Sequence, residues 1–316
     1  MTAQSDDTTS VASDLKPEFL SDGHLAIGPS PQFPEVPRWA TVANVPTREL
    51  PPIPRYVCKR VATPLTIDGR LDEPAWQRAE WSAPLGRIET GILDAPPCSV
   101  ALLWDETYLY AGFRVTDPDI RGAAVRHHEQ LYMRDDDAEI FVKGDGRYYE
   151  LGVNPINTIY EFRWTWLEPL VESRDFAGIE ELFKTRDFVY YTARGGERAG
   201  RVGDMNWELP GLRHAVAIDG TLNMPHDVDA GWTVEYALPW ASLAHIGLAP
   251  PSPGNELRIQ AYRACHNRAE SEKAAEMAKA WPGATPYEGY TWSTMGNGNV
   301  HNPERWAYVT LSDEAA

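Results

Sequence analysis

The chain has 316 residues, of which 43% are hydrophobic, and it carries 26 prolines, 24 glycines and a formal net charge of −17. This composition is typical of a protein built from strands and loops, and it disfavours a helical bundle. The negative charge disfavours binding to nucleic-acid phosphates and to an anionic membrane surface, whereas a neutral sugar, a metal cation or a basic partner stays compatible.

Residues 1–54 differ in composition from the rest of the chain. Met1–Lys16 is rich in serine, threonine and aspartate, and residues 28–54 carry eight prolines. We therefore predict a partly disordered extension over residues 1–54 and one folded domain over residues 55–316. The first residues have neither the basic nor the apolar region of a signal peptide, so a cytoplasmic location is expected. No stretch approaches the length of a membrane-spanning segment.

Strand signals dominate from Ile53 onward. Several segments place apolar side chains at every second position, as a half-buried strand requires. The expected core faces are Leu109, Ala111, Phe113 and Val115; Tyr149, Leu151 and Val153; Trp232, Val234, Tyr236 and Leu238; and Leu257, Ile259 and Ala261. Turn residues separate these segments. We predict an all-β fold, an antiparallel β-sandwich of the jelly-roll or immunoglobulin-like kind, with a few short helices in its loops.

Helix signals are few. Asp72 stands before Glu73 and Pro74, so it is expected to cap a short helix rather than to bind a ligand. Phe176–Phe183 and Arg268–Ala280 are predicted to form two more short helices, the second one exposed because its charges are mixed.

Two residue types are expected in the core. The three cysteines are widely spaced and form no C-x-x-C pattern, so buried free thiols are favoured over one disulfide. Three tryptophans stand in apolar strand or helix contexts. The cysteines are Cys58, Cys98 and Cys265, and the tryptophans are Trp76, Trp104 and Trp240.

An acidic run precedes an apolar strand: Asp135, Asp136, Asp137 and Glu139. Carboxylates gathered at a strand entrance suit Ca²⁺, a hard cation that takes oxygen ligands, and Asp135 and Asp137 are the candidate ligands. Carboxylates also accept hydrogen bonds from sugar hydroxyls. A solvated acidic turn is the plainer interpretation. Asp137 and Glu139 would share one strand face roughly 6.5–7 Å apart, so a catalytic pair is a further alternative.

Aromatic residues are abundant, with 12 tryptophans and 14 tyrosines. Flat rings with polar groups around them suit the apolar C–H faces of sugars, although most of the rings must belong to the core. The location of four rings near loops or strand ends stays open: Tyr132, Trp164, Trp292 and Trp306.

The histidines are scattered, and His127 and His128 are adjacent. Neighbouring residues of a strand point to opposite faces, so joint metal binding by this pair is not expected unless they lie in a turn. The sequence contains none of the G-x-S-x-G, H-E-x-x-H, P-loop or dinucleotide fingerprints, which counts against the common enzyme classes.

Five segments in fixed order resemble one family. They are IDGRLDEPAW (67–76), ALLWDETYLYAGFRVTD (101–117), RDDDAEIFV (134–142), GWTVEYALPW (231–240) and HNPERWAYVTL (301–311). Together they resemble the family 9 carbohydrate-binding module, and most of all its stand-alone relatives. The resemblance implies a β-sandwich that binds a poly- or oligosaccharide and holds structural Ca²⁺. It also implies a setting in carbohydrate catabolism beside glycosyl hydrolases, with relatives that are often exported.

The resemblance also implies a site. Family members clamp a terminal sugar between two tryptophans, and this sequence has Tyr132 at the first position and Val300 followed by His301 at the second. Glu139 matches a family glutamate, and Gly152 stands where those modules have an arginine. Trp292 could supply the second ring. The residues expected to bind carbohydrate are Tyr132, Arg134, Asp136, Glu139, Gln260, Trp292 and His301.

Two other functions stay open at this point. One is an enzyme that acts on a glycosidic bond or a sugar-like molecule, with Asp137 and Glu139 as its acid pair. The other is a haem-binding sandwich protein, for which Met133 and His301 are the available axial ligands.

Overall fold

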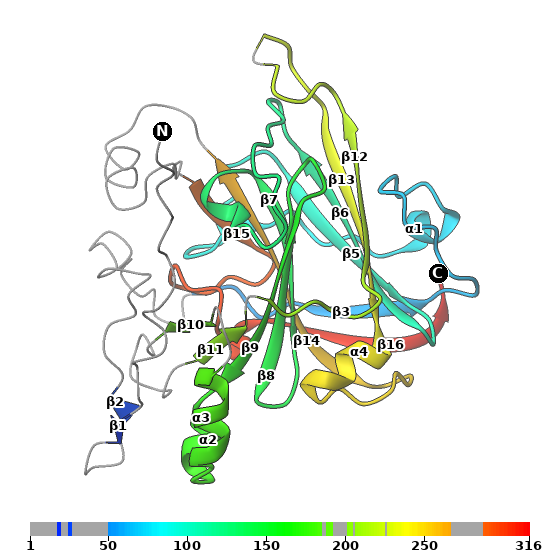
Figure 1. Cartoon of the computed structure of the whole chain (residues 1–316). Coiled ribbons are helices and arrows are strands. Elements are labelled where there is room, and N and C mark those ends of the chain that lie inside the picture. Colours follow the sequence, from blue (N-terminus) through cyan, green and yellow to red (C-terminus); the bar gives the residue numbers. More distant parts are fainter. Residues whose placement is uncertain are drawn as a thin grey trace, which may run out of the picture.

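The computed structural model describes residues 18–19, 25–26, 50–184, 188–191, 201–204, 206–224, 226–266 and 287–316 (Figure 1). Its helices are α1 (Pro74–Arg78), η4 (Leu131–Met133), α2 (Glu168–Glu172), α3 (Phe176–Lys184), α4 (Trp240–Leu243), η5 (Ala244–Ile246) and η6 (Pro303–Arg305). Within the described ranges, none of the helices combines the length and the hydropathy that a bilayer span requires.

Strands are the main regular element of the described structure. A small pair is formed by β1 (Glu18–Phe19) and β2 (Leu25–Ala26). The large sheet contains β3 (Arg55–Arg60), β4 (Gly86–Arg87), β5 (Cys98–Trp104), β6 (Tyr108–Thr116), β7 (Asp137–Lys143), β8 (Arg147–Val153), β9 (Ile159–Trp166), β10 (Phe188–Tyr191), β11 (Arg201–Asp204), β12 (Arg213–Asp219), β13 (Gly231–Pro239), β14 (Glu256–His266), β15 (Tyr287–Thr291) and β16 (Ala307–Ala315). The predicted class, mostly β with few short helices, is confirmed.

The sheet is mixed, which corrects the prediction of a purely antiparallel arrangement. Its order is β10-β11-β9-β8-β7-β14-β16-β3-β5-β6-β13-β12, and β15 joins β14 to β4 at one side. Strand β3 pairs in parallel with both β16 and β5. A parallel pair needs a long crossover, and the chain between β3 and β5 supplies one that contains α1 and β4. The jelly-roll or immunoglobulin-like connection stays a prediction.

The alternation read from the sequence places the main core correctly. The alternating apolar residues predicted for β6, β8, β13 and β14 are all buried in one cluster. That cluster takes side chains both from β5, β6 and β13 and from β7, β8 and β14, so two parts of the sheet face each other across it, which is consistent with a sandwich.

Two further clusters cover the outer faces of this sandwich. An aromatic cluster lies over β7, β8, β9 and β14 and includes Phe141, Tyr148, Trp164 and Trp306. A third cluster packs α1 against β5, β6 and β13. Figure 1 shows α1 on the same side of the molecule as the C terminus, and Arg78 donates from Nη2 to the carbonyl of Ala316 at 2.7 Å.

The motif IDGRLDEPAW is held to β13 by one buried carboxylate. Glu235 accepts hydrogen bonds from the backbone N–H of Asp68 (2.9 Å) and Gly69 (2.7 Å) and from Trp76 Nε1 (2.8 Å). Gly69 has a φ of 86°, and a Cβ there would lie 2.6 Å from the carbonyl carbon of Val216. Two motifs more than 150 residues apart in sequence are thus fixed together by one side chain.

Other sequence predictions meet mixed outcomes. Asp72 does not cap α1, because the helix begins at Pro74 and Glu73 takes the capping position without a side-chain hydrogen bond to the helix. The helix predicted over residues 176–183 is α3. The one predicted over Arg268–Ala280 lies outside the described residues. All three cysteines are free thiols, with Cys265 only partly buried. Trp76, Trp104 and Trp240 are buried as predicted.

Replacing Glu235 with alanine is expected to destabilise the fold. The change leaves three donors without their acceptor in a buried site, and the expected loss in unfolding free energy is about 3 kcal/mol. Urea unfolding of Glu235→Ala measures this loss. Glu256→Ala is the control, because Glu256 is half exposed and pairs with exposed Arg55 at the surface. Equal unfolding free energies for the two variants would contradict the assigned role.

Candidate functional site

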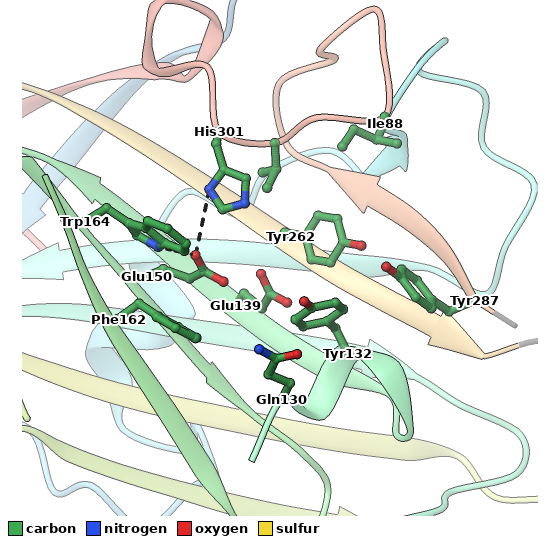
Figure 2. Close-up of a pocket in the computed structure, with 12 residues that line it drawn as sticks. Ile88, Gln130, Tyr132, Glu139, Glu150, Phe162, Trp164, Tyr262, Tyr287 and His301 are labelled. Atoms are coloured by element: carbon green, nitrogen blue, oxygen red, sulfur yellow. Dashed lines mark hydrogen bonds and ion pairs between the residues drawn. The ribbon is translucent and has the colours of Figure 1, made fainter. Parts of the chain in front are cut away.

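A pocket lies on the aromatic outer face of β7, β8, β9 and β14 (Figure 2). It is a recess that is partly open to solvent, and its empty volume of about 580 Å³ includes the solvent at its mouth. Its lining comes from these strands, from the segment around η4 and from the loop before η6. The lining residues are Ile88, Gln130, Tyr132, Glu139, Glu150, Phe162, Trp164, Tyr262, Tyr287, Gly298, Val300 and His301.

Two buried carboxyl groups lie at the centre of this lining. In the β7–β8 ladder Glu139 is paired with Gly152 and Phe141 with Glu150, so the two glutamates are diagonal neighbours on one face. Burial raises the pKa of Glu139 well above its usual range, and the nearby acids Asp137 and Glu150 raise it further. Burial also raises the pKa of Glu150 to about 7. Both groups therefore keep protons far more readily than exposed glutamates do.

Glu150 is held in place by donors from β9 and faces a histidine. Trp164 Nε1 donates to its Oε2 at 2.6 Å, and the Tyr160 hydroxyl donates to its Oε1 at 3.2 Å. His301 Nδ1 lies 3.8 Å from Glu150 Oε2 and shares a hydrogen bond of 2.8 Å with the Tyr148 hydroxyl. Figure 2 shows His301 above Glu150, with Trp164 beside them. The carboxyl group is oriented before any ligand arrives.

Tyrosine rings form the more open part of the pocket. Tyr132, on η4, and Tyr287, on β15, are both half-buried, and their ring centroids are 5.9 Å apart at 75°. Tyr262 stands directly across from Glu139 in the β7–β14 ladder. Rings at steep angles to each other around an acidic centre create a recess with apolar walls and polar groups at its base.

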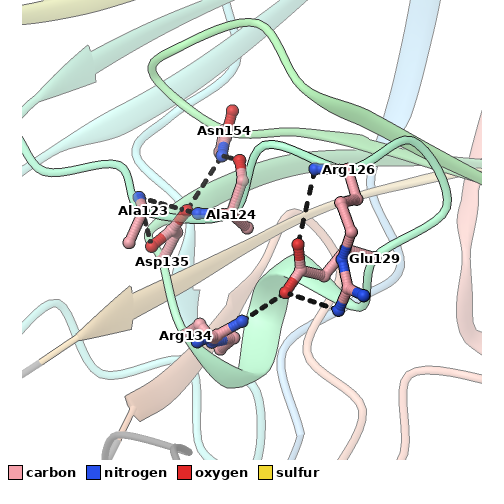
Figure 3. Close-up of polar contacts among 7 residues, drawn as sticks. All are labelled: Ala123, Ala124, Arg126, Glu129, Arg134, Asp135 and Asn154. Carbon is pink, nitrogen blue, oxygen red and sulfur yellow. Dashed lines mark hydrogen bonds and ion pairs between the residues drawn. The ribbon is translucent and has the colours of Figure 1, made fainter. Parts of the chain in front are cut away.

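The acidic run at the start of β7 makes hydrogen bonds that connect separate segments of the fold (Figure 3). Asp135 accepts from the backbone N–H of Ala123 (2.9 Å) and Ala124 (2.8 Å) and from Asn154 Nδ2 (2.9 Å). Asp137 accepts from the N–H of Ala264 at 3.0 Å. Donors thus occupy Asp135, whereas Oδ2 of Asp137 is buried and receives no N–H among the described residues. A structural Ca²⁺ ion at Asp135 and Asp137 stays a prediction.

Other predicted site residues lie outside the pocket lining. Asp136 accepts from the N–H of His266 (2.6 Å), and its Oδ2 lies 3.6 Å from Arg263 Nη2. Arg134 is exposed and pairs with Glu129, as Figure 3 shows. Asp137 and Met133 are likewise absent from the described lining.

Gln260 and Trp292 also lie away from the pocket. Gln260 is buried, donates to the carbonyl of Ser293 at 2.8 Å and accepts from the N–H of the same residue at 2.9 Å. Trp292 packs against the main core and meets Tyr56 edge-on at 5.4 Å. The pocket brings together Tyr132, Glu139 and His301 from the predicted set.

Sequence reasoning missed three central residues: Glu150, Tyr262 and Tyr287. Glu150 and Tyr262 follow from alternation, because they occupy the faces opposite the predicted core positions of β8 and β14. Gly152 fits the same face for a steric reason. A Cβ there would lie 2.5 Å from Tyr160 Cε1 and 3.1 Å from Glu139 Cγ, so a large side chain cannot take its place without moving both.

Comparison with known proteins agrees with this picture. Residues 67–163 match the model of the carbohydrate family 9 binding domain-like family. This segment carries Tyr132, Glu139 and Glu150. The predicted resemblance to that family is thereby confirmed, over less than half of the chain. No curated protein sequence matches the chain.

Solved structures are similar at low sequence identity. A Bacteroides uniformis protein proposed to bind carbohydrate is 14% identical, with a TM-score of 0.52, over 82% of this chain and 100% of that one. A family 9 module from Caldicellulosiruptor kristjanssonii in complex with cellotriose is 16% identical, with a TM-score of 0.46, over 82% of this chain and 93% of that one. A family 9 module from Caldicellulosiruptor kristjanssonii in complex with glucose is 13% identical, with a TM-score of 0.42, over 81% of this chain and 95% of that one. The first likeness shows a shared fold.

Replacing Glu150 with glutamine is expected to change how stability depends on pH. The folded-state pKa, about 7, lies above the usual value of 4.5, so the group's stabilisation is present below pH 4.5 and is lost as pH rises through 7. Glutamine stays neutral throughout. The stability of Glu150→Gln relative to the parent should therefore rise by about 3 kcal/mol between pH 4.5 and pH 8.

Urea unfolding of both proteins at several pH values measures this difference. Exposed Glu256→Gln is the matched control and should show no comparable trend. A stability difference for Glu150→Gln that stays constant from pH 4.5 to pH 8 would show that the carboxyl group is not buried as described.

Proposed function

We propose that this protein binds carbohydrate in the pocket between Tyr132, Tyr287 and the glutamates of β7 and β8. The observation that carries the proposal is the pocket itself, in which aromatic walls surround two buried carboxyl groups on the outer face of a sandwich. The match of residues 67–163 to a carbohydrate-binding family supports it, since that segment supplies both glutamates and Tyr132.

The chemistry of the lining suits a sugar. A sugar ring has apolar C–H faces that pack on aromatic rings, and its hydroxyl groups donate to carboxyl oxygens. Glu139 is buried beside Asp137, Glu150 and the Tyr160 hydroxyl, so its oxygens have lost water. A hydroxyl donor from the ligand would replace the lost hydration. Binding thus offsets part of the cost of burying this group.

The sign of the charge restricts the kind of sugar. Among the described lining residues none is lysine or arginine, and His301 is the one ionisable base. A uronic acid would bring a carboxylate next to Glu150, which is ionised above pH 7, and like charges repel. Neutral sugars of the glucose type are therefore the proposed ligands, as single residues or at the ends of poly- or oligosaccharides. The same proposal places the protein in carbohydrate catabolism, beside glycosyl hydrolases.

The pocket also contains a pair of carboxyl groups, which raises the alternative of hydrolysis. Glycosidases pair a protonated acid with an ionised carboxylate. Here burial raises the pKa of both Glu139 and Glu150, whereas that mechanism needs one carboxylate whose ionised form is favoured. Of the pair predicted from the sequence, Glu139 lines the pocket and Asp137 does not. This electrostatic pattern favours binding over bond cleavage.

Replacing Tyr132 with alanine is expected to weaken sugar binding by about tenfold or more, because an aromatic wall of the recess is lost. Calorimetry against neutral mono- and oligosaccharides, including glucose and cello-oligosaccharides, measures the change. Tyr308→Ala is the control: Tyr308 is half-buried on β16 and stacks with Arg258 at 3.8 Å, outside the pocket lining. Unaltered affinity in Tyr132→Ala, or no heat with any sugar, would overturn the proposal.

Charge selectivity provides a second, independent check. Glucose-type oligosaccharides should bind at least about tenfold more tightly than matched uronic acids at pH 8, where like-charge repulsion in the pocket is largest. In Glu150→Gln the discrimination should shrink, since one acidic group is removed. Tighter binding of the uronic acid by the parent protein would contradict the assigned electrostatics.

A further inference from the structure

Three side chains outside the sugar pocket converge on one point without hydrogen-bonding one another. They are His127 and His128, in the loop between β6 and η4, and Glu208, in the segment after β11. Glu208 Oε1 lies 3.8 Å from His127 Nδ1 and 3.8 Å from His128 Nε2. One ligand atom from each residue lies within 4.8 Å of the other two. These distances exceed a hydrogen bond of about 2.7–3.2 Å.

A turn makes this convergence possible. Adjacent residues of a strand would point apart. His128 instead has a φ of 63°, in the left-handed region, and its backbone N–H donates to the carbonyl of Ile159 at 3.1 Å. The two imidazole rings consequently stack, with centroids 4.0 Å apart and planes within 9° of parallel. Because the lone pair of an imidazole nitrogen lies in the ring plane, one ring has to rotate about its Cβ–Cγ bond for both to bind one ion. Joint metal binding by this pair requires that both histidines lie in a turn, and they do.

The distances suit a transition-metal ion. Zinc binds histidine nitrogen and carboxylate oxygen at about 2.0–2.2 Å, so neighbouring ligand atoms of a tetrahedral site are about 3.4 Å apart. The two distances to Glu208 need to shorten by a few tenths of an ångström, and the two histidine nitrogens lie within 4.8 Å of each other. Glu208 is well placed for this adjustment, because its side chain is two-thirds exposed (67%). Two imidazoles and one carboxylate leave a fourth position for water.

The buried carboxylate of Glu161 lies beside His127, on the side of the ring opposite Glu208. Glu161 Oε2 lies 3.5 Å from His127 Nε2, while Glu161 Oε1 accepts from the N–H of Leu209 at 2.7 Å. A proton on Nε2, directed at Glu161, leaves His127 Nδ1 with its lone pair toward Glu208. Histidine ligands of metals are commonly oriented by such a carboxylate. Glu161 also fixes the residue next to Glu208, so one side chain positions two of the three ligands.

The second histidine carries an orphaned atom. His128 Nδ1 is buried and has no hydrogen-bond partner within the part of the chain that the structure describes. The ring is therefore not held by hydrogen bonds at both nitrogens, and its other nitrogen, Nε2, is the one that faces Glu208. A bond from Nε2 to an ion would supply the missing anchor for this ring.

We propose that His127, His128 and Glu208 bind a divalent transition-metal ion such as Zn²⁺, with Glu161 orienting His127. The site would tie the segment after β11 to the loop that continues through Gln130 to Tyr132. Because side chains alternate along β9, Glu161 points to the face opposite Tyr160 and Phe162, so this site lies apart from the sugar pocket. The proposal does not depend on sugar binding.

Zinc titration of the chelator-treated full chain tests the site. Calorimetry with Zn²⁺ should give one saturable site, and Co²⁺ should give the visible absorption of a four-coordinate ion with histidine ligands. Glu208→Gln, a surface change that leaves the fold intact, should weaken Zn²⁺ binding by about tenfold or more. Glu161→Gln should weaken it by about 10–100-fold, as expected for a residue that orients a ligand.

His226→Ala is the control, because His226 is exposed and is not part of the cluster. It should bind Zn²⁺ like the parent. Circular dichroism of each variant verifies that the fold is retained. Absence of a saturable Zn²⁺ site, or equal Zn²⁺ affinity in Glu208→Gln, Glu161→Gln and His226→Ala, would overturn the proposal.

Discussion

Burial of carboxyl groups along β7 and its neighbours is the constraint on which the site depends. Asp135, Asp136, Asp137 and Glu139 are all buried within five residues. A buried carboxylate is costly unless donors or a cation compensate it. The first three acids meet N–H donors or Arg263, and they thereby hold the ends of β7 and β14 and the preceding loop in register. Glu139 lies beside Asp137, Glu150 and the Tyr160 hydroxyl, and it lines the pocket, where a ligand can reach it.

Because three of the acids stabilise the fold and Glu139 lines the pocket, the same strands can be stable and also bind a ligand. On the inner face of β7 and β8 the side chains are apolar and closely packed, as a core requires. On the outer face aromatic rings cover the strands around Glu139 and Glu150. The rings exclude water and so raise the pKa of both glutamates. The aromatic cover that desolvates these acids is also the surface on which a sugar would pack.

Periodicity in the sequence was sufficient to predict the class of fold and the inner core, because side chains alternate along a strand whatever its partner. The parallel pairing of β3 was not predictable in this way, since it depends on which distant strands flank it. Tyr132, Glu139 and His301 were placed through family resemblance and do meet in the pocket. Gln260 and Asp136 were placed by the same route, yet both lie outside the pocket lining. Gln260 is hydrogen-bonded to Ser293, and Asp136 is hydrogen-bonded to His266.

The residues that sequence reasoning missed share a physical cause. Glu150 and Tyr262 sit opposite the core positions of their strands, on a face that would be solvent-exposed if the aromatic cluster did not cover it. Alternation predicts which side chains leave the core, but not whether a second layer buries them again. His127 and His128 show the same limit for loops: strand geometry separates adjacent side chains, and only the left-handed turn at His128 brings the rings together. Where the chain folds back over a polar face, tertiary contacts decide which charged side chains form a binding site. The local alternation of side chains does not.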